Sequence, residues 1–219
     1  MLAAQFTREG GYRVVFTVAN PAIIQRKLSA GETPDIVILP APIIESLVKT
    51  GVLGPASRVD LARVGVGLVV REGAPLPDIS TADGVRTALL RARSIVIPDP
   101  AGGGRTGAAL ARMMTQLGIA DAVKPKVTMM QAIAGGVELV AKGEVELGMF
   151  NISEILPVKG VTLVGALPPA LQSYIVFAAA IHAGSTSVAA AEDYIKLLSA
   201  PAAREYWRAG GLESMAPGS

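Results

Sequence analysis

The stretch 102–107, Gly-Gly-Gly-Arg-Thr-Gly, brings together residue types that can bind an anion. Residues 95–97 before it are typical of a short buried strand, and 108–117 after it carry apolar residues at helical spacing. A glycine-rich loop would therefore deliver Arg105 and Thr106 to a helix N-terminus, where free N–H groups and the helix dipole favour negative charge. The planar guanidinium of Arg105 suits a carboxylate or a phosphate. An ordinary strand–loop–helix connection with a solvated Arg105 fits the same residues, and this stretch alone leaves both interpretations open.

The same six residues match the pattern Gly-x-Gly-x-x-Gly of dinucleotide-binding folds. Those folds need an acidic residue about 20 positions later, at the end of the next strand. Here the next strand, 127–129, ends in methionine, and Asp121 comes too early, in a loop. We interpret the match as a coincidence in a glycine-rich loop. Because no Gly-Lys-Ser/Thr follows, a P-loop is excluded too, and we predict no cofactor.

Two acidic residues lie beside candidate loops. Asp99, between two prolines, is expected to hold the glycine loop by side-chain-to-backbone hydrogen bonds. Glu154 follows the strand 146–150, and we interpret it as a first-turn acid of a helix, with a functional role as the alternative. The chain has no cysteine and a single histidine, His182, so thiolate metal sites are excluded and a histidine zinc site or a Ser-His-Asp triad is disfavoured. We predict no metal site.

The composition limits the classes of partner. The 219 residues carry a net charge of +2, their basic residues are scattered, and only 4% are aromatic, so we expect no nucleic-acid partner. Mean hydropathy is +0.47, yet no run approaches the roughly 20 apolar residues of a membrane-spanning helix, and we expect no membrane insertion. Residues 1–10 lack the basic start and apolar core of a signal peptide.

Strand and helix patterns alternate along nearly the whole chain, which predicts a doubly wound α/β architecture. The expected strands are 12–18, 35–39, 64–70, 95–97, 127–129, 146–150, 161–164 and 173–181, and the expected helices include 22–30, 43–49, 80–92, 108–117, 132–142 and 188–198. Ligands in such folds bind outside the carboxyl ends of the strands. Four junctions of that kind are visible, at 19–22, 40–42, 99–107 and 150–154.

The chain begins within a helical pattern that has no N-cap and no preceding strand. We therefore expect that an N-terminal strand is missing. In that case the sheet would lack a neighbour for the strand 12–18, or would expose an apolar groove there.

Four segments together resemble the type II periplasmic substrate-binding proteins, specifically their molybdate-binding branch. The segments are Asn20–Leu39, Asp99–Gly107, Val137–Gly148 and Tyr194–Leu212, which between them span most of the chain in the family's order and spacing. The resemblance implies two α/β lobes joined by two crossover strands. Lobe I would comprise 1–70 with 170–219, and lobe II would comprise 71–169.

The resemblance also implies a small anion held between the lobes, mainly by loop N–H groups and hydroxyls. By position, its contacts would be Asn20, Pro21, Gly103, Gly104, Arg105, Thr106, Gly107, Gly136, Val137 and Asn151. The chain has Asn20-Pro21 where molybdate binders present a serine, Asn151 where they place a tyrosine, and an additional cation, Arg105. We therefore expect an organic carboxylate more than molybdate. The resemblance further implies a periplasmic monomer that delivers its ligand to an ABC transporter permease.

One branch of the same superfamily resembles aconitate isomerase, an enzyme built on a binding-protein scaffold. Arg105 and the glycine loop would suit a polycarboxylate, and Glu154 or a lysine would supply the base for proton abstraction. The two hypotheses are thus a solute-binding protein without chemistry and a tricarboxylate isomerase. Conversion of cis-aconitate to its trans isomer would separate them.

Overall fold

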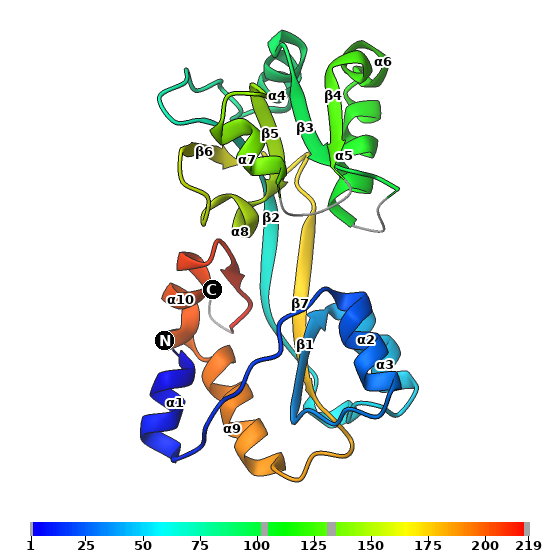
Figure 1. Ribbon diagram of the computed structural model, residues 1–219, viewed down its shortest axis with the longest axis vertical. Coiled ribbons are helices and arrows are strands. Elements are labelled where there is room, and N and C mark those ends of the chain that lie inside the picture. Colours follow the sequence, from blue (N-terminus) through cyan, green and yellow to red (C-terminus); the bar gives the residue numbers. More distant parts are fainter. Residues whose placement is uncertain (1, 102–104, 131–134, 217–219) are drawn as a thin grey trace. The chain divides into compact units, whose positions relative to one another are not determined.

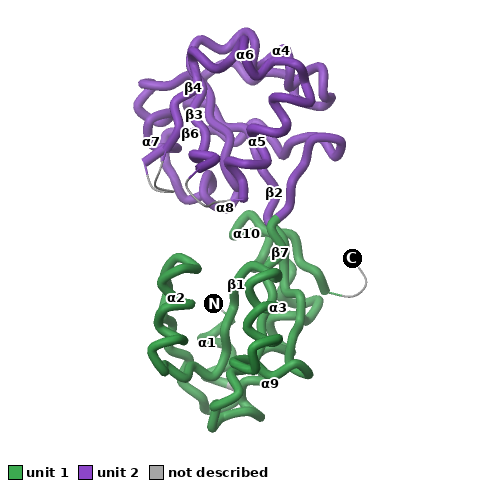
Figure 2. The backbone as a smooth tube through the Cα atoms, turned by 90° about the vertical axis from the view of Figure 1, so that its right-hand side faces the viewer, with its two compact units in different colours: residues 1–63, 175–219 green, residues 64–174 purple. Residues whose placement is uncertain are grey.

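The computed structural model describes residues 2–101, 105–130 and 135–216, and the chain divides into two compact units (Figure 2). Unit 1 comprises Met1–Arg63 and Ile175–Ser219, and unit 2 comprises Val64–Tyr174. The chain passes between the units twice, once within the long strand β2 and once at the start of strand β7. The boundaries expected from the sequence, 70/71 and 169/170, fall inside β2 and just before β7.

Unit 1 is built around a strand pair with helices on both faces. Strand β1 runs antiparallel to β7, from Ile36 opposite Ile181 to Pro40 opposite Phe177. Helices α2 and α3 bury leucine and isoleucine side chains against one face, and α1 and α9 pack on the other (Figure 1). The bounds in unit 1 are α1 Leu2–Gly10, α2 Pro21–Ser29, β1 Ile36–Pro40, α3 Ala41–Lys49, β2 Val59–Arg71 up to Arg63, β7 Tyr174–Ile181, α9 Val188–Ser199, α10 Arg204–Ala209 and β8 Glu213–Ser214.

Unit 2 contains a mixed five-stranded sheet. Strand β3 is parallel to β4 on one side and to β5 on the other, and β2 runs antiparallel to β5 and β6. The bounds are α4 Ala82–Arg91, β3 Ile95–Pro98, α5 Arg105–Gln116, α6 Ala120–Val123, β4 Val127–Met130, α7 Gly136–Ala141, β5 Leu147–Asn151, α8 Ile152–Ile155 and β6 Val161–Ala166.

Successive side chains of β3 and β5 pack into two separate cores, one on each face of the unit 2 sheet. Ile95 and Ile97 of β3 pack with α4, α5 and α6, whereas Val96 between them packs with α7 and α8. Met149 and Phe150 of β5 divide in the same way. In β5 and in residues 95–97 of β3, side chains that point to opposite faces are therefore all buried, as expected of central strands covered by helices on both sides. Among the residues described, no helix is both long enough and apolar enough to cross a membrane.

The strand expected over 12–18 is wrong, because this segment is extended but belongs to no strand of the structure. Most of its apolar side chains stay open to solvent: Phe16 is exposed and Val18 is 91% exposed, whereas Val14 packs partly against the core of unit 1. The paired residues of β1 are matched with β7, and none is matched with 12–18. Strand propensity reflects packing against a paired neighbour, so without such a neighbour the alternating pattern leaves the segment irregular.

Candidate functional site

A chain of three polar side chains lies at one edge of the unit 2 sheet. The Thr106 hydroxyl donates to Asn151 Oδ1 at 2.9 Å, and Asn151 Nδ2 donates to Glu154 Oε1 at 2.8 Å. Thr106 is 6% exposed and Asn151 is 8% exposed, and they are the two buried polar residues in the described part of the chain. Buried polar groups are stable when they are hydrogen-bonded to one another, so this chain fixes the side chains that form it.

The sheet topology explains why residues 45 positions apart meet. Strands β3 and β5 are parallel neighbours, with Ile95 opposite Leu147, so their carboxyl ends lie at the same edge. Asn151 is the last residue of β5, and α5, which begins at Arg105, follows β3. This edge is where ligands bind in open α/β sheets.

Gly107 lets the start of α5 approach the end of β3. A Cβ added at this position would lie 2.5 Å from the Pro98 carbonyl oxygen and 2.8 Å from the Asp99 carbonyl carbon and oxygen. Real Cβ atoms essentially never come that close, so only glycine fits here without a backbone shift. The predicted site residue Gly107 therefore has a packing role that seats Thr106 beside Asn151.

Arg105 is the first residue of α5 and is exposed. None of the ion pairs between described residues involves it. Its guanidinium can therefore reach a ligand without giving up such a pair. The predicted contacts Gly103 and Gly104 lie outside the described residues. Asp99 accepts the Ala101 N–H at 2.8 Å, which is the side-chain-to-backbone hydrogen bond expected of it.

Gly136 and Val137 open the short helix α7 next to the same edge. A Cβ at Gly136 would lie 2.5 Å from Phe150 Cζ, so glycine is required for the helix to pack on β5. Val137 is 2% exposed and belongs to the core with Phe150, which leaves its backbone rather than its side chain for any ligand. Gly135 before them has a φ of 104°, and its N–H donates to Glu138 Oε2 at 3.0 Å.

Asn20 and Pro21 belong to unit 1, at the start of α2. The Asn20 side-chain oxygen accepts the Ile23 N–H at 2.9 Å, as an N-cap residue does, and Pro21 occupies the first turn. The capping bond uses the amide oxygen of Asn20, so its Nδ2 group is the part that can donate to an anion.

Glu154 is the titratable end of the polar chain. It lies in the first turn of α8, as expected, but it also accepts the hydrogen bond from Asn151. Burial raises the pKa of its carboxyl above the ordinary value, and hydrogen bonds from Asn151 act in the opposite direction. The site thus links the Thr106 hydroxyl, through Asn151, to a carboxyl that holds its proton more tightly than a solvated glutamate does.

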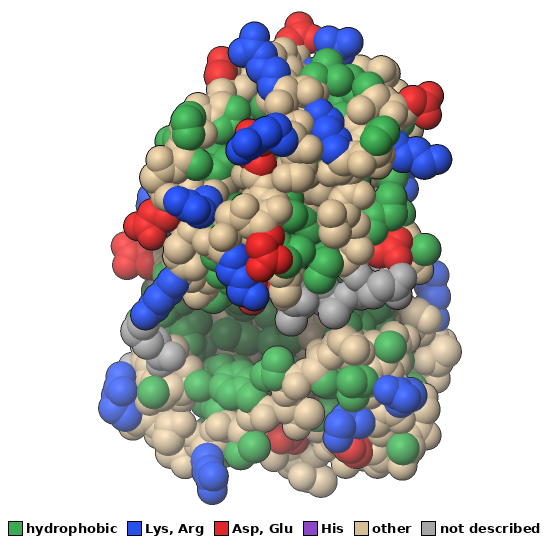
Figure 3. All heavy atoms as spheres, turned by 45° about the horizontal axis from the view of Figure 1, so that its top comes forward, with side chains coloured by type: hydrophobic (Ala, Val, Ile, Leu, Met, Phe, Trp, Pro, Cys, Tyr) green, Lys and Arg blue, Asp and Glu red, His purple; other side chains and the backbone are tan. Residues whose placement is uncertain are grey.

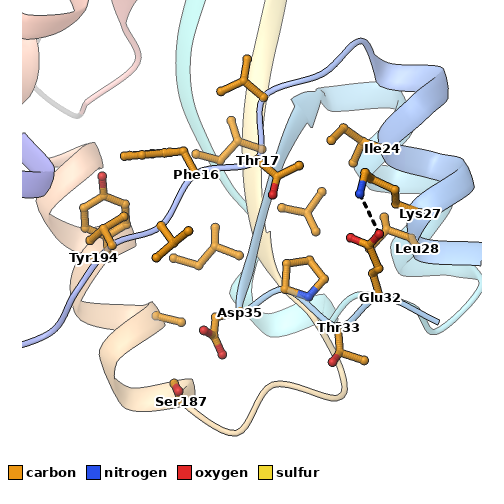
Figure 4. A pocket seen from close by; sticks show the side chains of 18 of the residues that line it. Phe16, Thr17, Ile24, Lys27, Leu28, Glu32, Thr33, Asp35, Ser187 and Tyr194 are labelled. Atoms are coloured by element: carbon orange, nitrogen blue, oxygen red, sulfur yellow. Dashed lines mark hydrogen bonds and ion pairs between the residues drawn. The ribbon is translucent and has the colours of Figure 1, made fainter. Parts of the chain in front are cut away.

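Unit 1 contains a separate cavity of about 830 Å³ (Figure 4). It lies between the extended segment 12–19, helix α2, strand β1 and helix α9, where Phe16, Ile24, Leu28 and Tyr194 make it largely apolar. Lys27 and Glu32, 2.7 Å apart, form an ion pair in its lining (Figure 4). None of the described residues that the sequence predicted as ligand contacts lines this cavity.

Charged side chains of both signs lie on the surface of unit 2. On the face in Figure 3, lysine and arginine side chains are interspersed with aspartate and glutamate over unit 2. Within the ranges that the structure describes, no group of three or more His, Asp or Glu side chains is placed to hold a metal ion.

Comparisons with known proteins agree on one family. Residues 1–213 match the model of the family described as bacterial extracellular solute-binding protein. An aconitate isomerase from a Pseudomonas species is 30% identical over 195 residues, which cover 89% of this chain and 72% of that protein. The molybdate-binding protein ModA of Escherichia coli K12 is 25% identical over 215 residues, 96% and 82% of the two chains. In structure, a substrate-binding domain from Clostridium difficile superposes with a TM-score of 0.84 at 14% identity, covering 97% of this chain and 91% of that one.

Proposed function

The chain belongs to the bacterial extracellular solute-binding proteins, and from this premise we propose that it captures a small anion at the ligand edge of unit 2. The observation that carries the proposal is the buried pair Thr106–Asn151 where the carboxyl ends of β3 and β5 meet. Thr106 lies in the first turn of a 12-residue helix whose N-terminal N–H groups favour negative charge. Gly136 and Val137 at the start of helix α7 are the further predicted contacts in unit 2.

We infer an organic carboxylate more than molybdate as the ligand. Arg105 supports this choice, because a guanidinium forms two parallel hydrogen bonds with a carboxylate and is exposed at the helix start. One relative is named an aconitate isomerase and another a molybdate-binding protein, so both ligand classes occur among similar chains. Delivery to an ABC transporter permease from the periplasm, as a monomer, is part of the same proposal.

The test is a binding screen followed by substitution of Arg105. Thermal shift over molybdate, tungstate, sulfate, citrate and both aconitate isomers would identify ligands, and calorimetry would give their affinities. A charge-assisted hydrogen bond contributes roughly 1.5–3 kcal/mol, so Arg105→Ala should weaken carboxylate binding about ten- to a hundredfold. Arg105→Lys should restore only part, because the two-pronged geometry is lost.

Arg112→Ala is the matched control, since Arg112 is an exposed arginine on the same helix. It should leave affinity unchanged. If Arg105→Ala also leaves affinity unchanged, Arg105 is an ordinary surface residue. If molybdate and tungstate bind and carboxylates do not, the carboxylate proposal is wrong.

We propose isomerisation of a tricarboxylate as the second candidate function. The relative at 30% identity favours it. The raised pKa of Glu154 favours it too, because a carboxylate with a higher pKa is a stronger general base for removing a proton from the carbon beside a substrate carboxylate. Nuclear magnetic resonance would follow cis-aconitate for appearance of the trans isomer. Loss of roughly a hundredfold or more in rate with Glu154→Gln would support the base role. Binding of cis-aconitate without conversion would contradict it.

A further inference from the structure

The polar chain Thr106–Asn151–Glu154 joins a candidate ligand contact to a titratable group. Its two hydrogen bonds measure 2.9 and 2.8 Å, and Thr106 and Asn151 are more than nine-tenths buried. An asparagine amide has a donor end and an acceptor end. The chain therefore has a direction, and the protonation state of Glu154 sets that direction.

With Glu154 ionised, the carboxylate can only accept hydrogen bonds. Asn151 must then turn its Nδ2 toward Glu154 and its Oδ1 toward Thr106, which is the arrangement observed. The Thr106 hydroxyl must donate its one hydrogen to Asn151. What it can offer a ligand is a lone pair, and a lone pair repels the oxygen of an anion.

With Glu154 protonated, the chain can reverse without loss of a hydrogen bond. The Glu154 O–H donates to Asn151 Oδ1 once the amide has turned end for end, and Nδ2 then donates to Thr106 Oγ1. The amide turn exchanges an oxygen and a nitrogen of similar size, so the heavy-atom positions are kept. The Thr106 hydrogen is now free to point at a ligand.

We propose that capture of an anion at Thr106 is coupled to uptake of one proton by Glu154, with Asn151 transmitting the change of hydrogen-bond direction. This coupling rests on the proposed function, since it requires that the anion contact Thr106. An anion without a hydroxyl offers acceptor atoms alone, so Thr106 must donate to it. The proton comes from solvent and resides on a Glu154 carboxyl oxygen, and no covalent bond of the ligand changes.

The surroundings of Glu154 leave the carboxyl without a charged partner in the part of the chain that the structure describes. Strands β5 and β6, which contact α8, carry no ionisable side chain, and helix α7 in the same core contributes Glu138, which is engaged with the Gly135 N–H. The cations Lys159 and Arg105 form no ion pair with Glu154. Burial raises the pKa of Glu154, hydrogen bonds from Asn151 act in the opposite direction, and no ion pair between described residues holds the carboxylate in its charged form.

Calorimetry in buffers of different ionisation enthalpy tests the coupling directly. The probes are molybdate and trans-aconitate, titrated at several pH values from about 5 to about 8. Wild-type protein should take up one proton per bound anion at pH values above the pKa of Glu154. Its affinity should fall about tenfold per pH unit above the pKa of Glu154.

Glu154→Gln separates the coupling from a structural role. Glutamine has the size of glutamic acid and can donate to Asn151 Oδ1 at any pH, so Thr106 stays free to donate. Proton uptake and the pH slope should vanish, and affinity at the upper pH should exceed that of wild type. Thr106→Val should lower anion affinity and abolish its dependence on pH. Glu144→Gln is the control, because it alters an exposed carboxylate on the same unit, and it should keep the pH dependence of wild type.

The outcomes are distinguishable. If neither probe binds at any pH while each variant unfolds cooperatively, the proposed anion binding fails and the coupling fails with it. If a probe binds wild type without proton uptake, the coupling is wrong and anion binding stands. If Glu154→Gln keeps the wild-type pH slope, another group takes the proton and the assignment to Glu154 is overturned.

Discussion

Replacing Gly107 with alanine should loosen the junction that seats Thr106. The added Cβ would lie 2.5 Å from the Pro98 carbonyl oxygen, and ordinary contact begins at 3.4 Å, so the start of α5 must move by about 0.9 Å. The obstructing atoms of Pro98 and Asp99 are backbone, so no side-chain rotation relieves the clash. Overpacking of this kind costs roughly 1–3 kcal/mol, and the better helix propensity of alanine offsets up to about 1 kcal/mol.

We therefore expect Gly107→Ala to lower the free energy of unfolding by about 1–2 kcal/mol, measured by urea denaturation. The same shift disturbs the 2.9 Å bond from Thr106 to Asn151, so anion affinity should fall as well. Gly54→Ala is the matched control, because its φ of −69° is allowed and its nearest new neighbours would lie at 3.5 and 3.7 Å. It should be neutral or stabilising by up to about 1 kcal/mol. A Gly107→Ala protein with wild-type stability and affinity would refute the close-approach argument.

Four further substitutions have expected effects on stability that urea unfolding can check. Glu154→Gln should stabilise the protein near pH 8 and not near pH 4, because a pKa raised by burial means that folding binds protons and stability falls as pH rises. Glu146→Gln should behave oppositely: hydrogen bonds from Arg93 lower the pKa of Glu146, so its contribution, less than about 1 kcal/mol at this exposed site, is present at neutral pH and lost in acid. Phe16→Ser should change stability by less than about 0.5 kcal/mol, whereas Phe150→Ala, in the core at 0% exposure, should cost about 3–5 kcal/mol. Equal effects of the two phenylalanine changes would show that segment 12–19 is buried in solution.

Features that depend on neighbouring residues could be predicted from the sequence. The strand at Ile95, the helix that starts near Arg105 and the helix that follows Asn20 all arise within a few residues, and the structure contains each of them. The order of strands and helices then identified an α/β fold, because alternating elements leave few ways to bury their apolar faces. Most of the architecture was therefore accessible without coordinates.

Features that depend on residues far apart in the sequence could not be predicted from local patterns. The alternating segment 12–18 satisfies every local criterion for a strand, yet a strand exists only if a neighbour pairs with it. Thr106, Asn151 and Glu154 were each named from the sequence, but by separate arguments: a helix start, a family position and a first-turn acid. Their contact depends on the parallel pairing of β3 with β5, which no local pattern specifies.

The direction of that hydrogen-bond chain bears on ligand choice in a way that net charge does not. Arg105 suits a carboxylate, but it binds every carboxylate in the same way, so it cannot by itself separate a hydroxy acid from an acid without a hydroxyl. The Thr106 hydroxyl does discriminate under the proposed coupling: it can donate to a ligand when Glu154 is protonated, and it can only accept from a ligand when Glu154 is ionised, because its hydrogen is then given to Asn151. A ligand that carries its own hydroxyl can donate to the accepting form and needs no proton uptake, whereas a ligand with acceptor atoms alone needs the donating form. The same three side chains would therefore favour hydroxy acids at high pH and acceptor-only anions at low pH, so selectivity follows from the location of a single proton.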